Sequence, residues 1–277
     1  MTRIAVVTTF NEASYDGYAG RMLDTFDRFW PGDIRLLAYS EQFKPPVKSD
    51  RIIFRDLLDA SPELVAFRER HRDNPRANGR ASRRLRLRVE WRKPKIRVLR
   101  VCEADSFMWQ AVRFSHKSFA IFHAAANCDA DILYWLDSDV ITRQAIPDSF
   151  IAQMMPANAM LSYIARRKFS DCCLTGFNLR HPLMTSFMAS FRHLYVADAL
   201  FKYPQYHDSY LFDVMRKRYE RMGAVNHDLA RGVGQAHGHV FDHCDLGIYL
   251  DHLKGARKDM NPPPEPVFKS LAGASSL

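Results

Sequence analysis

The stretch Asp131-Ile-Leu-Tyr-Trp-Leu-Asp-Ser-Asp-Val140 decides the fold. Its apolar part, Ile132 to Leu136, is too short and too rich in β-forming residues for a helix, and it fits a strand buried on both faces of a parallel sheet. Asp137 and Asp139 follow directly, so we expect them at the carboxyl end of that strand, where open α/β sheets bind ligands. Because hard divalent cations prefer carboxylate oxygens, the stretch predicts a Mg²⁺ or Mn²⁺ site that also binds a diphosphate. The alternative is an Asp-rich turn that caps the next helix.

The composition is that of a folded protein with a sizeable core. The chain has 277 residues, of which 47% are apolar and 12% aromatic, which excludes an intrinsically disordered protein. It contains no run of about 18 apolar residues, and its first residues lack the features of a signal peptide. The five cysteines are odd in number and form no Cys-x-x-Cys motif, which favours reduced thiols. We therefore expect a cytoplasmic protein.

The net charge of +9 is concentrated in one segment. Between Arg68 and Arg100 there are 14 Lys and Arg against three acidic residues, a local charge of +11, while the rest of the chain has a charge of −2. Such a segment suits an anionic membrane surface, an anionic acceptor or nucleic acid, or it is a solvated charge-rich insertion. Because the excess charge is local, nucleic acid is the least favoured of these partners.

The amino-terminal part has a β-α-β pattern. Residues 3–9 read as a buried strand, 11–16 as a polar turn, 18–30 as a helix and 34–39 as a second strand. This order predicts a parallel sheet with a right-handed crossover. Thr8, Thr9, Phe10 and Asn11 then lie at the same edge as the Asp pair, where a nucleotide base could stack and form hydrogen bonds. The alternative is that these residues only end a strand and begin a turn.

The remaining elements follow from periodicity and turn signals. We expect a strand at 51–54, a helix at 61–71 capped by Ser61, a helix at 103–126, a short helix from 145, a strand at 159–164, a tight loop into a strand over 171–182, and a helix from 207. Arg113 and Lys117 are four residues apart on the helix that precedes the Asp pair, so they share one face. They are candidates for contacts with the diphosphate, or they are surface charge.

A second element with polar groups lies near the carboxyl end, in the stretch Tyr249-Leu-Asp-His-Leu-Lys-Gly-Ala-Arg-Lys258. His252 is a candidate metal ligand. Gly255 permits backbone N–H groups to approach a phosphate, and Lys258 adds positive charge. An acidic metal site and this His-x-x-Gly-x-x-Lys element together meet the needs of one nucleotide diphosphate.

The two elements resemble those of the GT-A glycosyltransferases, in particular the glycogenin-like and bacterial galactosyltransferase-like retaining group. The resemblance implies that Asp137, Asp139 and His252 bind Mn²⁺ or Mg²⁺. It also implies that Gly255 and Lys258 contact the diphosphate and that Lys117, with Arg113 as a second candidate, binds the donor. The chain is further similar to a less-characterised set of bacterial GT-A-like proteins through residues 114–117, 176–182, 207–210 and 251–255.

The resemblance implies an α/β fold with a Rossmann-type, mostly parallel central sheet flanked by helices. It places one GT-A-like catalytic domain at residues 1–260, with the basic segment 68–100 as an insertion or lid, and a loosely ordered tail at 261–277. The implied reaction is the metal-dependent transfer of a sugar from a nucleotide-diphosphate sugar, with UDP-sugar favoured, to a hydroxyl acceptor. A surface glycan, a lipid-linked saccharide and a protein are the candidate acceptors, and the enzyme could touch an anionic membrane peripherally.

Whether the reaction needs a catalytic base depends on whether the enzyme inverts or retains the stereochemistry of the sugar. An inverting enzyme needs a carboxylate base for the acceptor hydroxyl, for which Asp208 and then Asp171 are the candidates, whereas a retaining enzyme could use front-face attack without a base. The retaining group often has Lys-Pro-Trp where this chain has Lys258, Asp259 and Met260. Its Asp-Gln-Asp element has no clean counterpart here, so both stereochemical outcomes stay open.

Three other interpretations compete with the glycosyltransferase. A zinc cluster is suggested by His237, His239, His243, Cys244 and Asp245, but the glycine-rich segment 232–243 and the lack of a second closing group favour a mobile loop over the donor site. A metal-dependent nucleotidyltransferase or phosphohydrolase would use the same acids without a sugar acceptor. A polyanion-binding protein would depend on Arg68 to Arg100 and ignore both metal and Asp139.

Overall fold

The computed structural model describes residues 2–47, 49–80, 83–90, 95–102, 106–235 and 238–258. Within these ranges the central feature is a seven-stranded sheet with the order β10-β8-β9-β6-β1-β2-β3. Its strands are β1 (Ile4–Phe10), β2 (Arg35–Ser40), β3 (Ile52–Asp56), β6 (Ile132–Leu136), β8 (Leu161–Ile164), β9 (Asp171–Asn178) and β10 (Asn226–Asp228). All neighbours run parallel except β9, which is antiparallel to both β6 and β8. The predicted α/β class with a mostly parallel central sheet is confirmed.

The central strands are buried on both faces, as the apolar run of β6 predicts. Leu133 and Trp135 pack into the core on one side of the sheet, whereas Tyr134 and Leu136 pack into the core on the other. All four are at most 2% exposed. Alternate residues of a strand point to opposite faces, so a run without polar residues is what a strand in this position requires.

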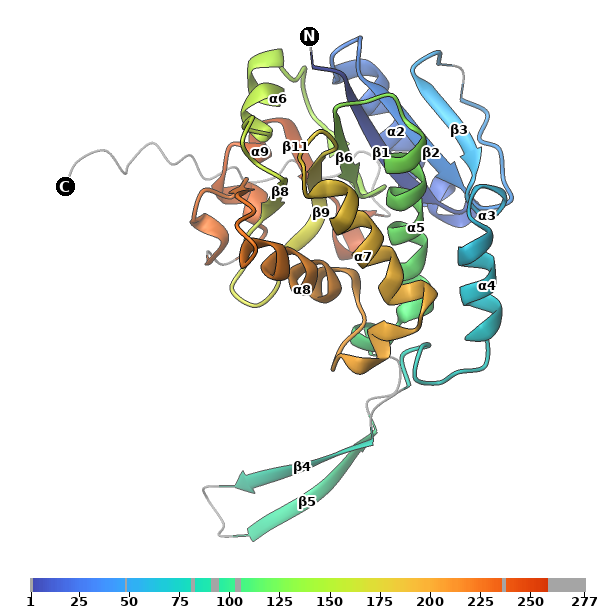
Figure 1. Cartoon of the computed structure of the whole chain (residues 1–277), viewed down its shortest axis with the longest axis vertical. Helices are drawn as coiled ribbons and strands as arrows, with labels where there is room; N and C mark the ends of the chain where they lie inside the picture. The colour runs from blue at the N-terminus through green and yellow to red at the C-terminus, as the bar shows by residue number, and fades with distance from the viewer. Residues whose placement is uncertain are drawn as a thin grey trace, which may run out of the picture.

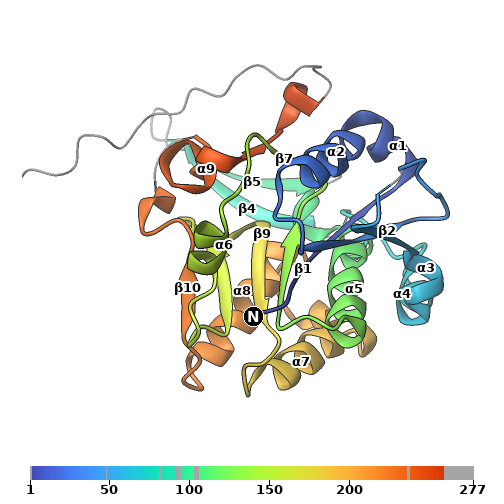
Figure 2. The same ribbon diagram turned by 90° about the horizontal axis from the view of Figure 1, so that it is seen from above.

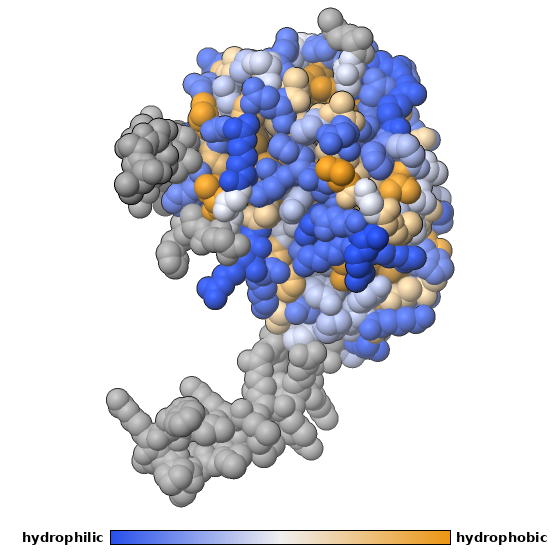
Figure 3. All heavy atoms as spheres, turned by 60° about the vertical axis from the view of Figure 1, so that its left-hand side comes forward, coloured by the Kyte–Doolittle hydropathy of each residue, from blue (hydrophilic) through white to orange (hydrophobic). Residues whose placement is uncertain are grey.

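Helices cover both faces of the sheet (Figures 1 and 2). One face is covered by α3 (Leu57–Ala60), α4 (Pro62–Arg70), α5 (Ala111–Asn127), α7 (Met184–Val196) and α8 (Asp208–Glu220), and the other by α2 (Gly20–Phe29), α6 (Asp148–Met154) and α9 (Leu246–Tyr249). The outward surface mixes hydrophilic and hydrophobic residues on the face that Figure 3 shows. None of the described helices combines the length and the apolar character needed to cross a bilayer.

Four local predictions differ from the structure. The expected turn at 11–16 is helical, because Asn11 caps α1 (Glu12–Ser14) and a π-helical turn (Tyr15–Ala19) joins it to α2. The long helix begins at Ala111 and follows a 3₁₀ turn (Phe107–Trp109), so its start at 103 is wrong. Ser61 occupies the N-cap position of α4, but its side chain makes no capping hydrogen bond. The expected loop at 171 is already strand β9.

The basic segment contains a separate two-stranded antiparallel sheet. Its strands are β4 (Arg83–Glu90) and β5 (Lys95–Cys102), and Figure 1 shows them apart from the seven-stranded sheet. The predicted tail at 261–277 lies outside the described residues, as does His237.

A second two-stranded sheet positions residues of the candidate site. Strand β7 (Val140–Thr142) follows the Asp pair and is antiparallel to β11 (Leu250–His252), with His252 paired to Val140. The backbone N–H of Leu253 also donates to the carbonyl oxygen of Asp139 at 2.8 Å. This pairing brings two segments that are more than a hundred residues apart in the sequence to one place.

Candidate active site

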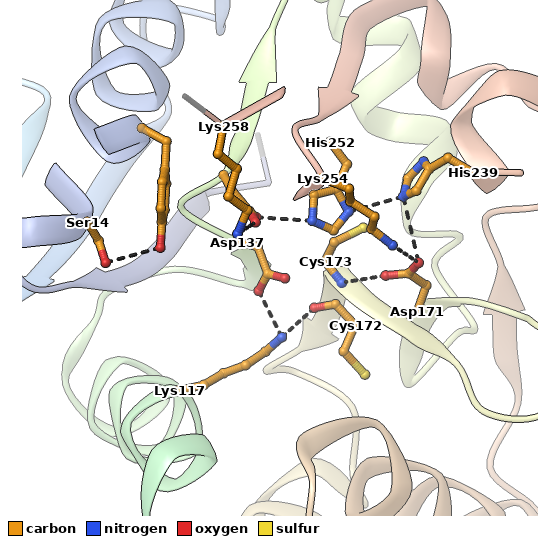
Figure 4. A network of polar contacts seen from close by, with 12 residues as sticks. Ser14, Lys117, Asp137, Asp171, Cys172, Cys173, His239, His252, Lys254 and Lys258 are labelled. Carbon is orange, nitrogen blue, oxygen red and sulfur yellow. Dashed lines mark hydrogen bonds and ion pairs between the residues drawn. The ribbon is translucent and has the colours of Figure 1, made fainter. Parts of the chain in front are cut away.

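Asp137, Asp139 and His252 converge at the carboxyl end of β6. One ligand atom from each residue lies within 4.8 Å of the others. Two carboxylates and one imidazole are a donor set that suits Mn²⁺ or Mg²⁺, both of which accept oxygen ligands and tolerate open positions. The residues therefore fit the predicted metal site, and Figure 4 shows Asp137 and His252 with Lys117 and Lys258 around them.

Asp139 lies between two positively charged or polarisable groups. His252 Nε2 is 3.1 Å from its Oδ1, and Lys258 Nζ is 2.5 Å from its Oδ2. Burial opposes ionisation of this carboxyl, but the hydrogen bonds and charges of His252 and Lys258 outweigh it and lower its pKa to about 2. The carboxylate is therefore ionised at neutral pH and available to a cation.

Lys117, on helix α5, contacts Asp137. Its Nζ is 2.9 Å from Asp137 Oδ1, 2.9 Å from Asp208 Oδ2 and 2.5 Å from the carbonyl oxygen of Cys172. Burial disfavours the ammonium, but the two carboxylates outweigh it and raise the pKa of Lys117. Burial also opposes ionisation of Asp208, yet Lys117 lowers its pKa. Lys117 thus holds a buried carboxylate on each side.

The orientation of Asp137 is fixed through one oxygen. Trp135 Nε1 donates to Oδ1 at 2.6 Å, and Lys117 bonds the same atom. The Asp137 backbone N–H donates to the carbonyl oxygen of Cys173 at 2.8 Å. These contacts leave Oδ2 as the oxygen suited to a cation, and they explain why the strand ends in Trp-Leu-Asp.

A cavity of about 390 Å³ opens beside these residues. It is lined by residues of β1, α1, α5 and the Asp pair, including Thr9, Phe10, Asn11, Tyr18, Arg113, Phe114, Lys117, Asp137, Asp139, Asp208 and Lys258. Its floor is polar and charged, and its walls include aromatic rings. A nucleotide diphosphate needs both features, because the phosphates require cations and the base requires an apolar surface.

The predicted donor-binding residues do not all reach this cavity. Phe10 and Asn11 line it, and so do Arg113 and Lys117. Thr8 does not, because it is fully buried in the sheet, and Thr9, on the opposite face of the strand, lines the cavity instead. Gly255 is exposed at the start of a 3₁₀ turn (Gly255–Lys258) with φ +58°, a conformation that favours glycine.

Sequence reasoning missed several residues of the cavity. The ring of Tyr18 lies 4.6 Å from Lys258 Nζ, and its hydroxyl donates to Ser14 Oγ at 3.0 Å. His116 Nδ1 lies 2.5 Å from Glu41 Oε1, and both residues line the cavity. Tyr18 and Ser14 are one helical turn apart, a signal that became usable only once residues 12–19 were known to be helical.

Asp171, the second candidate base, lies outside this cavity in a different cluster. Its Oδ2 is 3.2 Å from Lys254 Nζ and 3.7 Å from His239 Nε2. Burial opposes its ionisation, but Lys254, His252 and His239 outweigh it and lower its pKa. Burial, aided by His252 and Lys254, lowers the pKa of His239 to about 3, so this imidazole is neutral. His243, Cys244 and Asp245 form no ligand cluster among the described residues.

The comparisons with known proteins give structural neighbours only. No protein-family model matches the chain, and no curated protein sequence matches it. Mouse xyloside xylosyltransferase 1 is 13% identical, with a TM-score of 0.49 over 95% of this chain and 99% of that one. The galactosyltransferase LgtC, solved with donor and acceptor sugar analogs, is 12% identical with a TM-score of 0.40 over 76% and 69%.

A third neighbour is the glycosyltransferase GlyE of Streptococcus pneumoniae TIGR4, which is 9% identical with a TM-score of 0.44. The similarity covers 84% of this chain and 47% of that one. All three neighbours are glycosyltransferases. At these identities the neighbours assign no substrate to this chain.

Proposed function

We propose that the protein is a metal-dependent glycosyltransferase that moves a sugar from a nucleotide-diphosphate sugar to a hydroxyl acceptor. The observation that carries this proposal is the convergence of Asp137, Asp139 and His252 on one point, where Asp137, Asp139 and Lys258 line a cavity of about 390 Å³. A cation site alone would serve many reactions. The lysines and the aromatic wall beside it favour a nucleotide diphosphate as the ligand.

The chemistry requires stabilisation of the leaving group. A divalent cation bound by Asp137, Asp139 and His252 would supply positive charge for the diphosphate as the bond to the sugar breaks. Lys258 adds a second charge, since its half-exposed side chain can turn from Asp139 to a phosphate oxygen. Lys117 has a different role. It is held between two carboxylates and keeps Asp137 in place.

The acceptor side is proposed to lie near Asp208. This carboxylate lines the cavity, whereas Asp171 does not, so Asp208 is the better candidate for a base that receives the acceptor proton. Its bond to Lys117 keeps it ionised and therefore able to accept a hydrogen bond from a hydroxyl. The acceptor is proposed to be a glycan, a lipid-linked saccharide or a protein, with the basic segment available for an anionic acceptor or an anionic lipid surface.

Calorimetric titration of UDP and GDP, with and without Mn²⁺, tests the donor site. The wild type is expected to bind one nucleotide, with UDP favoured, only when Mn²⁺ is present. Asp139→Asn is expected to lose this binding because it removes one of two carboxylate ligands. Asp129→Asn is the matched control, since that side chain is 86% exposed and lies at the opposite end of β6.

The competing functions give different results. A nucleotidyltransferase or phosphohydrolase would bind or turn over a nucleoside triphosphate and ignore a nucleotide sugar. A polyanion-binding protein would bind anionic polymers with a steep salt dependence and show no effect of Mn²⁺ or of Asp139→Asn. Metal-independent binding, or no nucleotide binding in the wild type, would contradict the proposal.

A further inference from the structure

A second cluster of metal-ligating groups adjoins the site just described. Asp171, Cys173, His239 and His252 each offer one ligand atom, and all four atoms lie within 4.8 Å of one another. Figure 4 shows His252 between this cluster and the Asp137 side of the site. The four side chains come from β9, from the segment before the 3₁₀ turn Val240–His243, and from β11. They therefore form no motif that could be recognised in the sequence.

Two of the distances within the cluster are close to those of a tetrahedral zinc site. His239 Nε2 is 3.1 Å from His252 Nδ1 and 3.7 Å from Asp171 Oδ2. Zinc bonds of about 2.0 to 2.3 Å to nitrogen, oxygen and sulfur place neighbouring ligand atoms roughly 3.3 to 3.8 Å apart. The two imidazole nitrogens need to move apart by only a few tenths of an ångström to reach this spacing.

The donor set also favours zinc over the harder ions. Cys173 is buried at 1% exposure, and its thiolate is a soft ligand, whereas Mn²⁺ and Mg²⁺ prefer oxygen. A thiolate and a carboxylate would balance the charge of Zn²⁺, and two imidazoles would complete four ligands. Lys254, which bonds Asp171 in the absence of an ion, is 52% exposed at its side chain and can turn to solvent.

We propose that Asp171, Cys173, His239 and His252 bind Zn²⁺ at a structural site next to the catalytic cavity. The two sites use different nitrogens of His252, since Nε2 faces Asp139 and Nδ1 faces His239. The proposal is independent of glycosyl transfer, because its ligands other than His252 lie outside the donor site.

Binding releases protons in a defined way. The Cys173 sulfur loses its proton to solvent as the Zn–S bond forms, and His252 loses its remaining N–H proton to solvent when both sites are filled. His239 then holds its proton on Nδ1, so the hydrogen bond from the Phe241 N–H to that nitrogen, 3.2 Å in this structure, has to open. The bound ion would fasten the segment that ends in His252 to strand β9.

Cobalt substitution tests the site because a thiolate gives Co²⁺ an intense near-ultraviolet charge-transfer band. We expect the wild type to take up Co²⁺ with this band, and Cys173→Ser to lose it. Cys172→Ser is the matched control and is expected to keep the band, since Cys172 is also buried but belongs to no ligand cluster among the described residues. Asp139→Asn should keep the band while losing Mn²⁺-dependent nucleotide binding, so the two proposals fail separately.

X-ray absorption on the zinc-loaded wild type avoids reliance on a variant that does not fold. We expect one sulfur at about 2.3 Å and nitrogen or oxygen at about 2.0 to 2.2 Å. A wild type without the cobalt band and without zinc–sulfur scattering would overturn the proposal. A band that survives in Cys173→Ser would overturn it as well.

Discussion

Two cavities share helix α5, one lined by residues from its amino-terminal part and the other by residues from its carboxyl-terminal part, and their linings differ in chemistry. The larger, about 560 Å³, lies between α4, α5 and α7 and is lined mainly by apolar side chains such as Phe119, Phe122, Met184 and Met188. The smaller, about 390 Å³, lies at the carboxyl edge of the sheet and has Lys117, Asp137, Asp139 and Asp208 in its wall. The predicted site residues line the smaller cavity, so size alone does not identify the candidate site.

The two cavities differ in the chemistry of the side chains that line them, and this difference distinguishes the candidate site. The apolar cavity carries charge only at its rim, where Arg192 pairs with Glu63. The carboxylates of the polar cavity are only 12 to 29% exposed at their side chains, which costs free energy unless each one has a cation, as each one does. Lys117 and Phe119 show the contrast on one helix, since residues two apart on a helix face different directions.

The largest expected effect is a loss of stability on substitution of a residue that lines the apolar cavity. Phe119→Ala should lower the free energy of unfolding by about 3 to 4 kcal/mol, because Phe119 is 2% exposed and its loss enlarges a cavity that exists already. Urea denaturation measures this loss. Nucleotide affinity should be unchanged, and a fall in affinity would show that the two cavities are coupled.

The corresponding change at the polar cavity is Lys117→Met. It leaves Asp137 and Asp208 without their shared cation, so the free energy of unfolding should fall by about 3 kcal/mol. Mn²⁺ should restore part of this loss, because a bound cation replaces the missing charge, whereas it should restore nothing in Phe119→Ala. Urea denaturation of both variants with and without Mn²⁺ makes the comparison, and equal responses would contradict it.

A smaller effect is expected for Lys258→Met. The nucleotide should bind about tenfold more weakly, a loss of about 1.4 kcal/mol, because one phosphate-directed charge is removed. The free energy of unfolding should fall by less than in Lys117→Met, because Asp139 keeps its hydrogen bond to His252. Lys202→Met, at an exposed position in another part of the fold, is the control and should leave the affinity measured by calorimetry as it is.

The smallest effect is a gain. Ala125→Leu places apolar volume into the larger cavity and should raise the free energy of unfolding by about 0.5 to 1 kcal/mol. Thermal and urea denaturation would detect it. An unchanged nucleotide affinity would support the view that this cavity takes no part in donor binding, and a loss of affinity would count against it.

Much of the fold could be predicted from the sequence because its signals are local. The apolar run before Asp137 predicted a buried central strand, and the β-α-β pattern near the amino terminus predicted the parallel strands β1 and β2. The helical start at Glu12 was missed because residues 11–16 read as a polar turn. The antiparallel direction of β9 depends on contacts far along the chain, which no short pattern encodes.

The site divides in the same way. Asp137, Asp139, His252 and Lys258 were placed together by their residue types and spacing, and the β7–β11 pair explains how they meet. Thr8 and Thr9 were both expected near the donor, but only Thr9 lines the cavity, because the face to which a strand residue points is set by register rather than by composition. The cluster around Cys173 and His239 escaped notice, because its members approach one another only in the folded chain.

A crystal structure with UDP and Mn²⁺ tests the central claim most directly. Anomalous scattering from manganese should appear between Asp137, Asp139 and His252, with the diphosphate beside Lys258 and the base against the aromatic wall of the smaller cavity. Manganese bound elsewhere, or a nucleotide in the larger apolar cavity, would contradict the account.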